Sequence, residues 1–311
     1  MKLATTIGDF ESYTSCPAEA VAAFEGTGFK HLDYSFYSVI YPNSPFLGEN
    51  WKKEVTDAGE TAAKLGLDFV QAHSPSYNPL DPHFDHQAGM LATLRSIEAC
   101  SMLGIRNLVV HSGYTEDYTY PDGREGFFAA NERFYRSLVP AMEKFNVNVL
   151  IENSAEGNMG KRYYFMTGRE MTDFIEEFNH PLLQAVWDIG HANMRGADQY
   201  KDICDLGCHL NALHIQDNFG TFDEHFAPLM GTCDMDAVIQ ALLKIGYDGY
   251  FTFESERMLN TAGGWPHRRA ENPNLTHRRI ANPNLALRRV AEKLLYQIGK
   301  FMLESYDCFE D

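Results

Sequence analysis

Six side chains that can bind a metal ion or move a proton each follow a short apolar stretch of this sequence. In chain order they are His73, His111, Glu152, Asp188, His214 and Glu254. One such residue after an apolar stretch is most often a hydrogen-bonded structural group, but six make coincidence a poor explanation. They form a mixed oxygen and nitrogen donor set, which suits Mn²⁺, Mg²⁺, Co²⁺ or Zn²⁺ better than a thiolate-seeking ion. If they converge they predict a divalent cation, because carboxylates that meet without one repel each other.

The elements that must bring these residues together are eight apolar, β-rich stretches separated by helical patterns. Eight such units predict a single (β/α)8 TIM barrel domain over residues 1–311, in which the carboxyl ends of all strands open on one face. The six residues would then form a ring at that face. Strands are expected at 3–8, 31–36, 67–73, 105–111, 147–153, 182–188, 210–216 and 249–255. Helices are expected at 17–25, 50–65, 87–103, 125–145, 168–179, 235–245 and 285–304, with a short one at 198–207.

Composition narrows the class of protein. The chain has 311 residues and a net charge of −17, which argues against a nucleic-acid partner, since such partners are bound by clustered Lys and Arg. No apolar run approaches the roughly 18–20 residues that span a bilayer, so no membrane partner is expected. The amino terminus lacks the apolar core of a signal peptide. The six scattered cysteines are therefore expected to be reduced thiols of a cytoplasmic protein.

A tandem repeat precedes the last expected helix. "HRRAENPNLT" (267–276) is followed directly by "HRRIANPNLA" (277–286), and its Asn-Pro pairs are typical of turns. We interpret residues 260–284, approximately, as an inserted Arg-rich loop. It is either an anion-binding arm over the barrel mouth or a solvated or subunit-contact loop, and charge runs more often form solvated surfaces.

Five motifs resemble those of the xylose isomerase-like barrel superfamily, which contains sugar epimerases and isomerases as well as endonuclease IV. They are "VLIENS" (149–154), "WDIGH" (187–191), "ALHIQDN" (212–218), "DEH" (223–225) and "FTFES" (251–255). The resemblance covers roughly residues 1–260 and the closing helix. It implies one divalent ion held by four of the ring residues, with His191 touching the substrate. These four are Glu152, Asp188, His214 and Glu254.

The resemblance to endonuclease IV extends to the positions that hold its three zinc ions. It implies up to three zinc ions, with His73, His111, His191, Asp223 and His225 as additional ligands. The same five side chains could instead bind substrate, and for Asp223 and His225 the two roles are equally expected. Ketohexose epimerases carry an arginine where this chain has Gly220 and a second glutamate where it has Asn158, which argues against a tagatose-type substrate.

The function that this resemblance implies is a divalent-metal-dependent isomerase or epimerase of a sugar or sugar phosphate. Glu152 and Glu254 would be the catalytic carboxylates, moving a proton beside a metal-polarised carbonyl. Phe10, Tyr41 and Trp187 would be the apolar walls of the sugar site. The alternatives are a metal-dependent lyase or dehydratase, a multi-zinc phosphodiesterase and a sugar-binding subunit without turnover. Barrels of this kind commonly pair, so a homodimer or homotetramer is expected.

Overall fold

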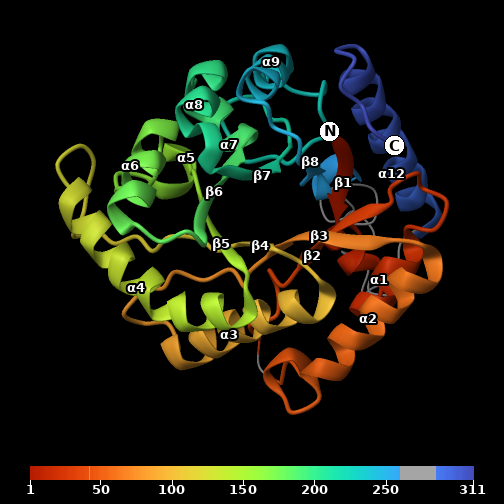
Figure 1. Ribbon diagram of the computed structural model, residues 1–311, viewed down its shortest axis with the longest axis horizontal. Helices are drawn as coiled ribbons and strands as arrows, with labels where there is room; N and C mark the ends of the chain where they lie inside the picture. Colours follow the sequence, from red (N-terminus) through yellow and green to blue (C-terminus); the bar gives the residue numbers. More distant parts are fainter. Residues whose placement is uncertain (42, 260–284) are drawn as a thin grey trace, which may run out of the picture.

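Eight parallel strands form the centre of the molecule, as expected (Figure 1). The computed structural model describes residues 1–41, 43–259 and 285–311, so the Arg-rich loop expected at 260–284 lies outside the described residues. The strands follow one another in the order β7-β6-β5-β4-β3-β2-β1-β8. They are Lys2–Thr6 (β1), His31–Ser35 (β2), Asp68–His73 (β3), Asn107–Val109 (β4), Asn148–Glu152 (β5), Leu183–Asp188 (β6), Leu210–His214 (β7) and Tyr250–Phe253 (β8).

Backbone contacts between the two end strands bring the sheet round on itself. Ile215, directly after β7, forms a parallel bridge with Phe253 of β8. Its amide donates to Thr252 O at 2.8 Å, and its carbonyl accepts from the Glu254 amide at 3.0 Å. The result is the (β/α)8 barrel that the alternating pattern predicted.

Helices surround the barrel (Figure 1). They are Pro17–Ala23 (α1), Trp51–Leu65 (α2), His86–Leu103 (α3), Arg124–Phe145 (α4), Glu156–Met159 (α5), Gly168–Phe178 (α6), Ile189–Met194 (α7), Gln199–Leu206 (α8), Met235–Ile245 (α9) and Leu285–Glu304 (α12). Short 3-10 helices occupy Ile7–Tyr13 (η1), Pro45–Leu47 (η2), Gly207–His209 (η3) and Glu256–Leu259 (η4). In the described parts of the chain, no helix has the length and apolar character needed to cross a bilayer.

The expected strands were one to four residues too long. β1 stops at Thr6 rather than residue 8 because the chain turns there into η1, which the Thr6 hydroxyl caps by accepting from the Gly8 amide. β4 keeps only three of seven expected residues. The helices α5 and α7 were not predicted from the sequence; α7 follows β6 directly, and α5 begins four residues after the end of β5.

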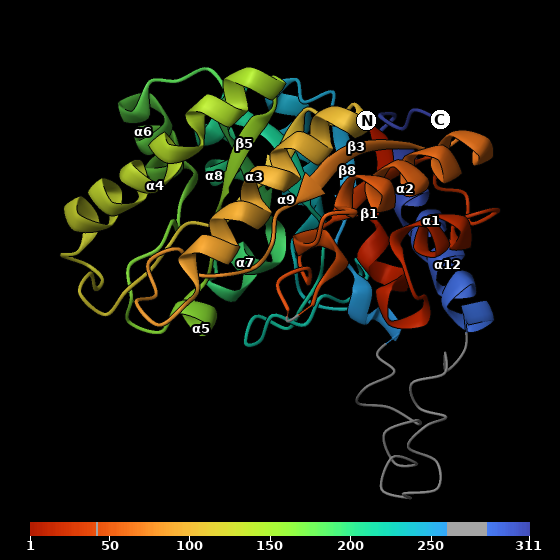
Figure 2. The ribbon, with the colours of Figure 1, turned by 90° about the horizontal axis from the view of Figure 1, so that it is seen from below.

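The two-residue period of the strands assigns side chains to the inside or the outside of the barrel. Val149, Ile151 and Trp187 belong to the large apolar cluster that joins the sheet to its helices. The alternate residues Val109, Leu150, Val186 and Ala212 form a separate small cluster. Two residues beyond each of these four lie His111, Glu152, Asp188 and His214, on the same inward face. Figure 2 shows α5 and α7 at this end of the barrel, with both chain termini at the opposite end.

Candidate active site

The inner cluster, defined as Glu152, Asp188, His214 and Glu254, comes from the ends of strands β5 to β8. Each residue offers a ligand atom, and these atoms all lie within 4.8 Å of one another. His214 Nδ1 lies 2.6 Å from Glu152 Oε1 and 3.3 Å from Glu254 Oε2. Asp188 is fully buried, whereas the Glu254 side chain is 20% exposed. The four side chains thus surround one small volume that is open to solvent on the Glu254 side.

Burial and mutual charge set the protonation of the inner cluster. Burial raises the pKa of Glu254 to about 8, although His214 and His225 act against it. Burial acts to lower the pKa of His214, but Glu254 and Glu152 outweigh it and raise that pKa to about 10. Burial also opposes ionisation of Glu152, yet His214 and His111 hold its pKa well below the usual range. Near pH 7 the cluster therefore keeps protons on Glu254 and His214, which a bound cation would displace.

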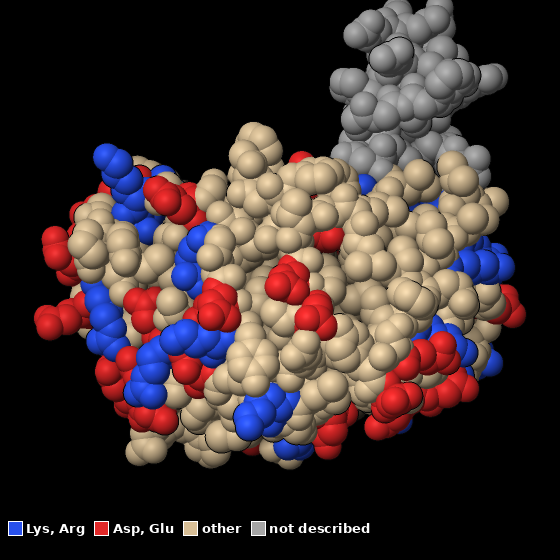
Figure 3. Space-filling view, turned by 90° about the horizontal axis from the view of Figure 1, so that it is seen from above, with Lys and Arg blue, Asp and Glu red and all other residues tan. Residues whose placement is uncertain are grey.

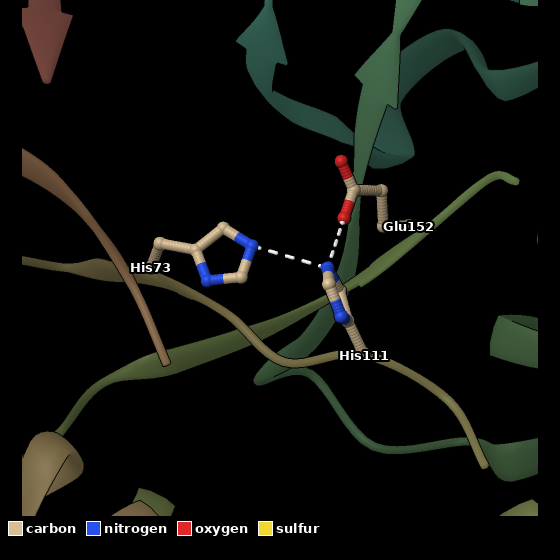
Figure 4. Close-up of side chains that lie close together, drawn as sticks. All are labelled: His73, His111 and Glu152. Atoms are coloured by element: carbon tan, nitrogen blue, oxygen red, sulfur yellow. Dashed lines mark hydrogen bonds and ion pairs between the residues drawn. The ribbon is translucent and has the colours of Figure 1, made fainter. Parts of the chain in front are cut away.

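The histidine pair, His73 and His111, stands beside this cluster and shares Glu152 with it. His111 Nε2 lies 2.8 Å from Glu152 Oε2, the oxygen that His214 does not use. His73 Nε2 lies 3.1 Å from His111 Nε2, and together with Glu152 the pair forms a second group of ligand atoms within 4.8 Å (Figure 4). Burial and His111 lower the pKa of His73 to about 3, so that this imidazole is neutral. Glu152 therefore belongs to both groups of candidate metal-ligand atoms.

The outer cluster consists of His191, Asp223 and His225. Asp223 and His225 lie in the loop after β7, which folds back because Asp217 and Phe226 exchange backbone hydrogen bonds of 2.8 and 2.9 Å. Asp223 then lies 3.2 Å from His191 Nε2 through one oxygen and 3.2 Å from His225 Nε2 through the other. Burial would lower the pKa of both imidazoles, but nearby carboxylates raise both well above the usual range. This cluster presents two charged imidazoles held by one carboxylate.

Two side-chain amides, those of Asn153 and Gln216, hold residues of the inner and outer clusters in place and were not predicted from the sequence. Asn153 donates to Asp188 O at 2.8 Å and accepts from the Asp188 amide at 2.7 Å, while its own carbonyl accepts from His191 Nδ1. Gln216 Nε2 donates to Asp223 Oδ1 at 2.7 Å and lies 3.4 Å from Asp188 Oδ1. Gln216 was predictable in principle, since it lies two residues beyond His214 and so shares the inward face.

A cavity of about 330 Å³ opens above the inner cluster, a size within the usual range of small-ligand sites. Glu152 and Glu254 line it together with the histidine pair and the outer cluster. Tyr37 closes one side, with its ring centroid 5.3 Å from that of His73. Asp188 and His214 lie beneath the lining. The structure thus brings to one cavity all nine side chains that the sequence analysis assigned to metal binding or to the substrate's polar contacts.

The three aromatic residues expected to contact a sugar lie elsewhere. Trp187 is fully buried, and its indole donates to Gln199 Oε1 on α8. It precedes Asp188 in β6, so the strand alternation turns it away from the site. Phe10 is also fully buried, and its ring centroid lies 4.7 Å from that of Phe24. The expectation of substrate contact was wrong for these two residues. Tyr41 is half exposed and lines a different cavity.

A model of the xylose isomerase-like TIM barrel family matches residues 29–274. The chain belongs to this family. A ketose 3-epimerase of Arthrobacter globiformis is 31% identical over 144 residues, which cover 42% of this chain and 44% of that protein. The chain spans less than two thirds of the length of the curated relatives that it matches.

Solved structures share the same fold. A D-tagatose 3-epimerase-like protein superposes with a TM-score of 0.69 at 20% identity, covering 99% of this chain and 98% of that chain. The IOLI protein, solved with a zinc atom, gives a TM-score of 0.69 at 15% identity and covers 98% of this chain and 99% of its own. At such identities the likeness establishes the barrel, and the chemistry must be argued from the site.

Proposed function

We propose that this protein is a divalent-metal-dependent epimerase or isomerase of a sugar or sugar derivative. The observation that carries the proposal is the inner cluster, whose four ligand atoms lie within 4.8 Å of one another at the base of a ligand-sized cavity. The names of similar proteins, among them a ketose 3-epimerase, support this choice of chemistry over others that a TIM barrel can host.

The donor set fits a single hard or borderline cation. Three carboxylates and one imidazole match the ligand preferences of Mn²⁺, Mg²⁺, Co²⁺ or Zn²⁺. The raised pKa values of Glu254 and Asp188, both caused chiefly by burial, are what carboxylates show when no cation offsets their charge. Bound there, the ion would polarise the substrate's carbonyl and neighbouring hydroxyl and make the adjacent C–H bond more acidic.

Glu152 and Glu254 are the proposed proton carriers. Both carboxylates line the cavity. Each also has one oxygen close to His214 Nδ1. If the two carboxylates stand on opposite faces of the substrate carbon, one removes a proton and the other returns it, which inverts that carbon. If a single carboxylate moves the proton between neighbouring carbons, aldose–ketose isomerisation results.

The outer cluster is proposed to orient substrate hydroxyls rather than to bind metal. Within the described residues only two groups bring their ligand atoms within 4.8 Å of one another, and the outer cluster is neither of them. Its two charged imidazoles are hydrogen-bond donors, which suits them to contact substrate hydroxyls.

Solvent exchange tests the proposal. The metal-loaded protein is incubated in D₂O with a panel of ketoses and aldoses, and deuterium at the carbon beside the carbonyl is followed by NMR. We expect exchange and a second sugar as product with at least one sugar. Glu254→Gln should abolish both, whereas Glu176→Gln on the exposed surface of α6 should change neither. Exchange with no sugar at all would overturn the proposal, and loss of water or of a glycosidic group without epimerisation would identify a lyase instead.

A phosphodiesterase is the second candidate, and the histidine pair favours it. Together with Glu152 the pair offers a second metal-binding group, which a one-metal epimerase does not need. The net charge of −17 acts against a nucleic-acid substrate, and on the face in Figure 3 basic side chains lie among acidic ones rather than in one continuous basic surface. Mass spectrometry of metals in the native protein separates the two. Three zinc ions per chain with phosphodiester cleavage would favour the phosphodiesterase.

A further inference from the structure

A second cavity of about 240 Å³ lies at the same end of the barrel as the active-site cavity. It is built from η1, which follows β1, from the segment after β2 and from the first turn of α2. No role in the chemistry described above involves it. Its lining is part apolar and part polar, and the polar side chains are Glu11, Thr14, Ser15, Ser35, Ser38, Tyr41, Ser44 and Glu54.

The linings of the two cavities are adjacent along the chain at Tyr37. Its side chain lines the active-site cavity, and the next residue, Ser38, lines the second one. The Tyr37 amide donates to the hydroxyl of Ser35, another residue of the second cavity, at 3.3 Å. A molecule held over the inner cluster therefore has the second cavity as its neighbour on the β2 side of the barrel mouth.

The lining of the second cavity defines what can occupy it. Four serine hydroxyls, one threonine hydroxyl and two carboxylates provide hydrogen-bond partners, and the half-exposed ring of Tyr41 provides a flat apolar surface. In the part of the chain that the structure describes, neither Lys nor Arg lines this cavity. Carboxylates without a cationic partner repel phosphate and carboxylate groups but accept hydrogen bonds from hydroxyls. Aromatic rings pack against the apolar faces of sugar rings.

We infer that the second cavity binds an uncharged, hydroxyl-rich unit of the substrate, so that the substrate is a glycosylated sugar rather than a free or phosphorylated hexose. This inference rests on the proposed function for the unit that reacts in the first cavity. The carboxylate of Glu11, which accepts from Ser38 Oγ at 3.3 Å, and the Tyr41 ring would hold the second unit.

A cavity-filling variant tests the inference. Ser38→Trp places a large side chain in the second cavity, at an exposed position that leaves the core and the inner cluster untouched. Ser101→Trp is the matched control, because Ser101 is exposed on α3 and lines neither cavity. The substrates are fructose, fructose 6-phosphate and two uncharged ketose disaccharides, lactulose and isomaltulose, assayed by deuterium exchange.

We expect the wild type to act on at least one disaccharide with kcat/KM about tenfold or more above that for fructose. Ser38→Trp should remove this advantage and leave the value for fructose within about twofold, whereas Ser101→Trp should alter neither. An unchanged ratio in Ser38→Trp, or fructose 6-phosphate as the preferred substrate, would overturn the inference and leave the proposed function intact.

Calorimetric titration with the same disaccharides separates the two failures. If no sugar exchanges deuterium, the proposed function fails, but disaccharide binding that Ser38→Trp weakens about tenfold would still support the second cavity as a sugar site. No binding, or binding that Ser38→Trp leaves unchanged, would overturn the inference independently of turnover.

Discussion

Arg288 of α12 forms a fully buried ion cluster whose removal should destabilise the barrel in a pH-dependent way. Its Nη2 lies 2.7 Å from Asp9 Oδ1 and 2.5 Å from Glu292 Oε1, and none of the three side chains is exposed to solvent. Arg288 Nη1 also donates to Glu256 O at 2.8 Å. The cluster thus joins η1, after β1, to η4, after β8, through the last helix.

The protonation of the two acids sets the size of the effect. Burial and the nearby Asp9 hold the pKa of Glu292 well above its usual range, whereas Asp9, with a pKa of about 6, is ionised near pH 8 and pairs with Arg288. At an effective dielectric constant of about 20, charges 2.7 Å apart attract by about 6 kcal/mol, which desolvation largely offsets. Removing one partner of a buried pair costs about 3–5 kcal/mol, and we expect this loss for Arg288→Met at pH 8.

At pH 5 the loss of unfolding free energy in Arg288→Met should be smaller than at pH 8. Burial raises the pKa of Asp9 to about 6 even beside Arg288, so this acid is largely protonated at pH 5 in the wild type. Without Arg288 both acids would have still higher pKa values. A folded-state pKa above the unfolded value means that the native state binds more protons, so stability falls as pH rises toward that pKa. The deficit of Arg288→Met should therefore shrink to about 1–2 kcal/mol at pH 5, where only hydrogen bonds and packing are lost.

Urea unfolding at pH 5 and pH 8, followed by circular dichroism, measures both values. Glu292→Gln keeps the shape of the side chain and removes only an acid whose pKa is already raised, so it should cost less than Arg288→Met at pH 8. Lys293→Met, exposed on the same helix, serves as the charge-matched control. An equal deficit at both pH values, or a Glu292→Gln loss as large as that of Arg288→Met, would refute the reasoning.

Three further outcomes follow from the inner cluster and its support. Glu152→Gln should weaken metal binding by about tenfold to a hundredfold, because it removes the negative charge of a candidate ligand that also pairs with His214. Competition with a chromophoric chelator measures the change in affinity. Metal binding should release protons at pH 7 and tighten as pH rises, because Glu254 and His214, with pKa values of about 8 and 10, carry protons without the ion; calorimetry in buffers of different ionisation enthalpy detects this. Gly190→Ala would place a Cβ 2.1 Å from the Gln216 side chain, and should lower kcat/KM about tenfold with metal content unchanged.

The strand pattern was sufficient to predict the barrel and a ring of six strand-end residues, and the family resemblance then singled out the four of the inner cluster. The reason is that strand alternation and strand ends are local properties, so Glu152, Asp188 and His214 could be placed at one face without coordinates. The expectation that Asp223 and His225 line the site came from the family resemblance alone. Their position depends on the backbone pairing of Asp217 with Phe226, which joins residues nine apart and leaves no periodic signal.

The aromatic residues show that the type of a residue does not predict substrate contact unless the direction of its side chain is also considered. Trp187 adjoins Asp188 in sequence, yet the alternation that turns Asp188 inward turns Trp187 outward against α8. The Arg-rich repeat raises the opposite difficulty. Arg288 lies two residues beyond this repeat, where a run of charges favours a solvated surface, yet it is fully buried between two carboxylates. Burial of a charge depends on partners distant in sequence, here Asp9.

The inside of the barrel differs in polarity on its two sides, and this difference bears on the chemistry of the inner cluster. Beneath the ends of β4 to β7 lie the apolar side chains Val109, Leu150, Val186 and Ala212, which provide no competing hydrogen-bond partner for the carboxylates above them.

On the other side Asp33 and Gln71 are buried together with Thr252, whose hydroxyl lies 3.3 Å from Gln71 Oε1. Burial raises the pKa of Asp33 to about 6, with His214 acting to lower it. Asp33 thus adds a fourth carboxylate to the three of the inner cluster that act on His214, which favours the protonated form of His214 when no cation is bound. A divalent ion bound by the inner cluster would displace that proton, and the negative charge of Asp33 would help to compensate the ion. The buried polar residues beneath the inner cluster would thus add negative potential that favours a bound cation. The apolar residues would leave the carboxylates without competing hydrogen bonds.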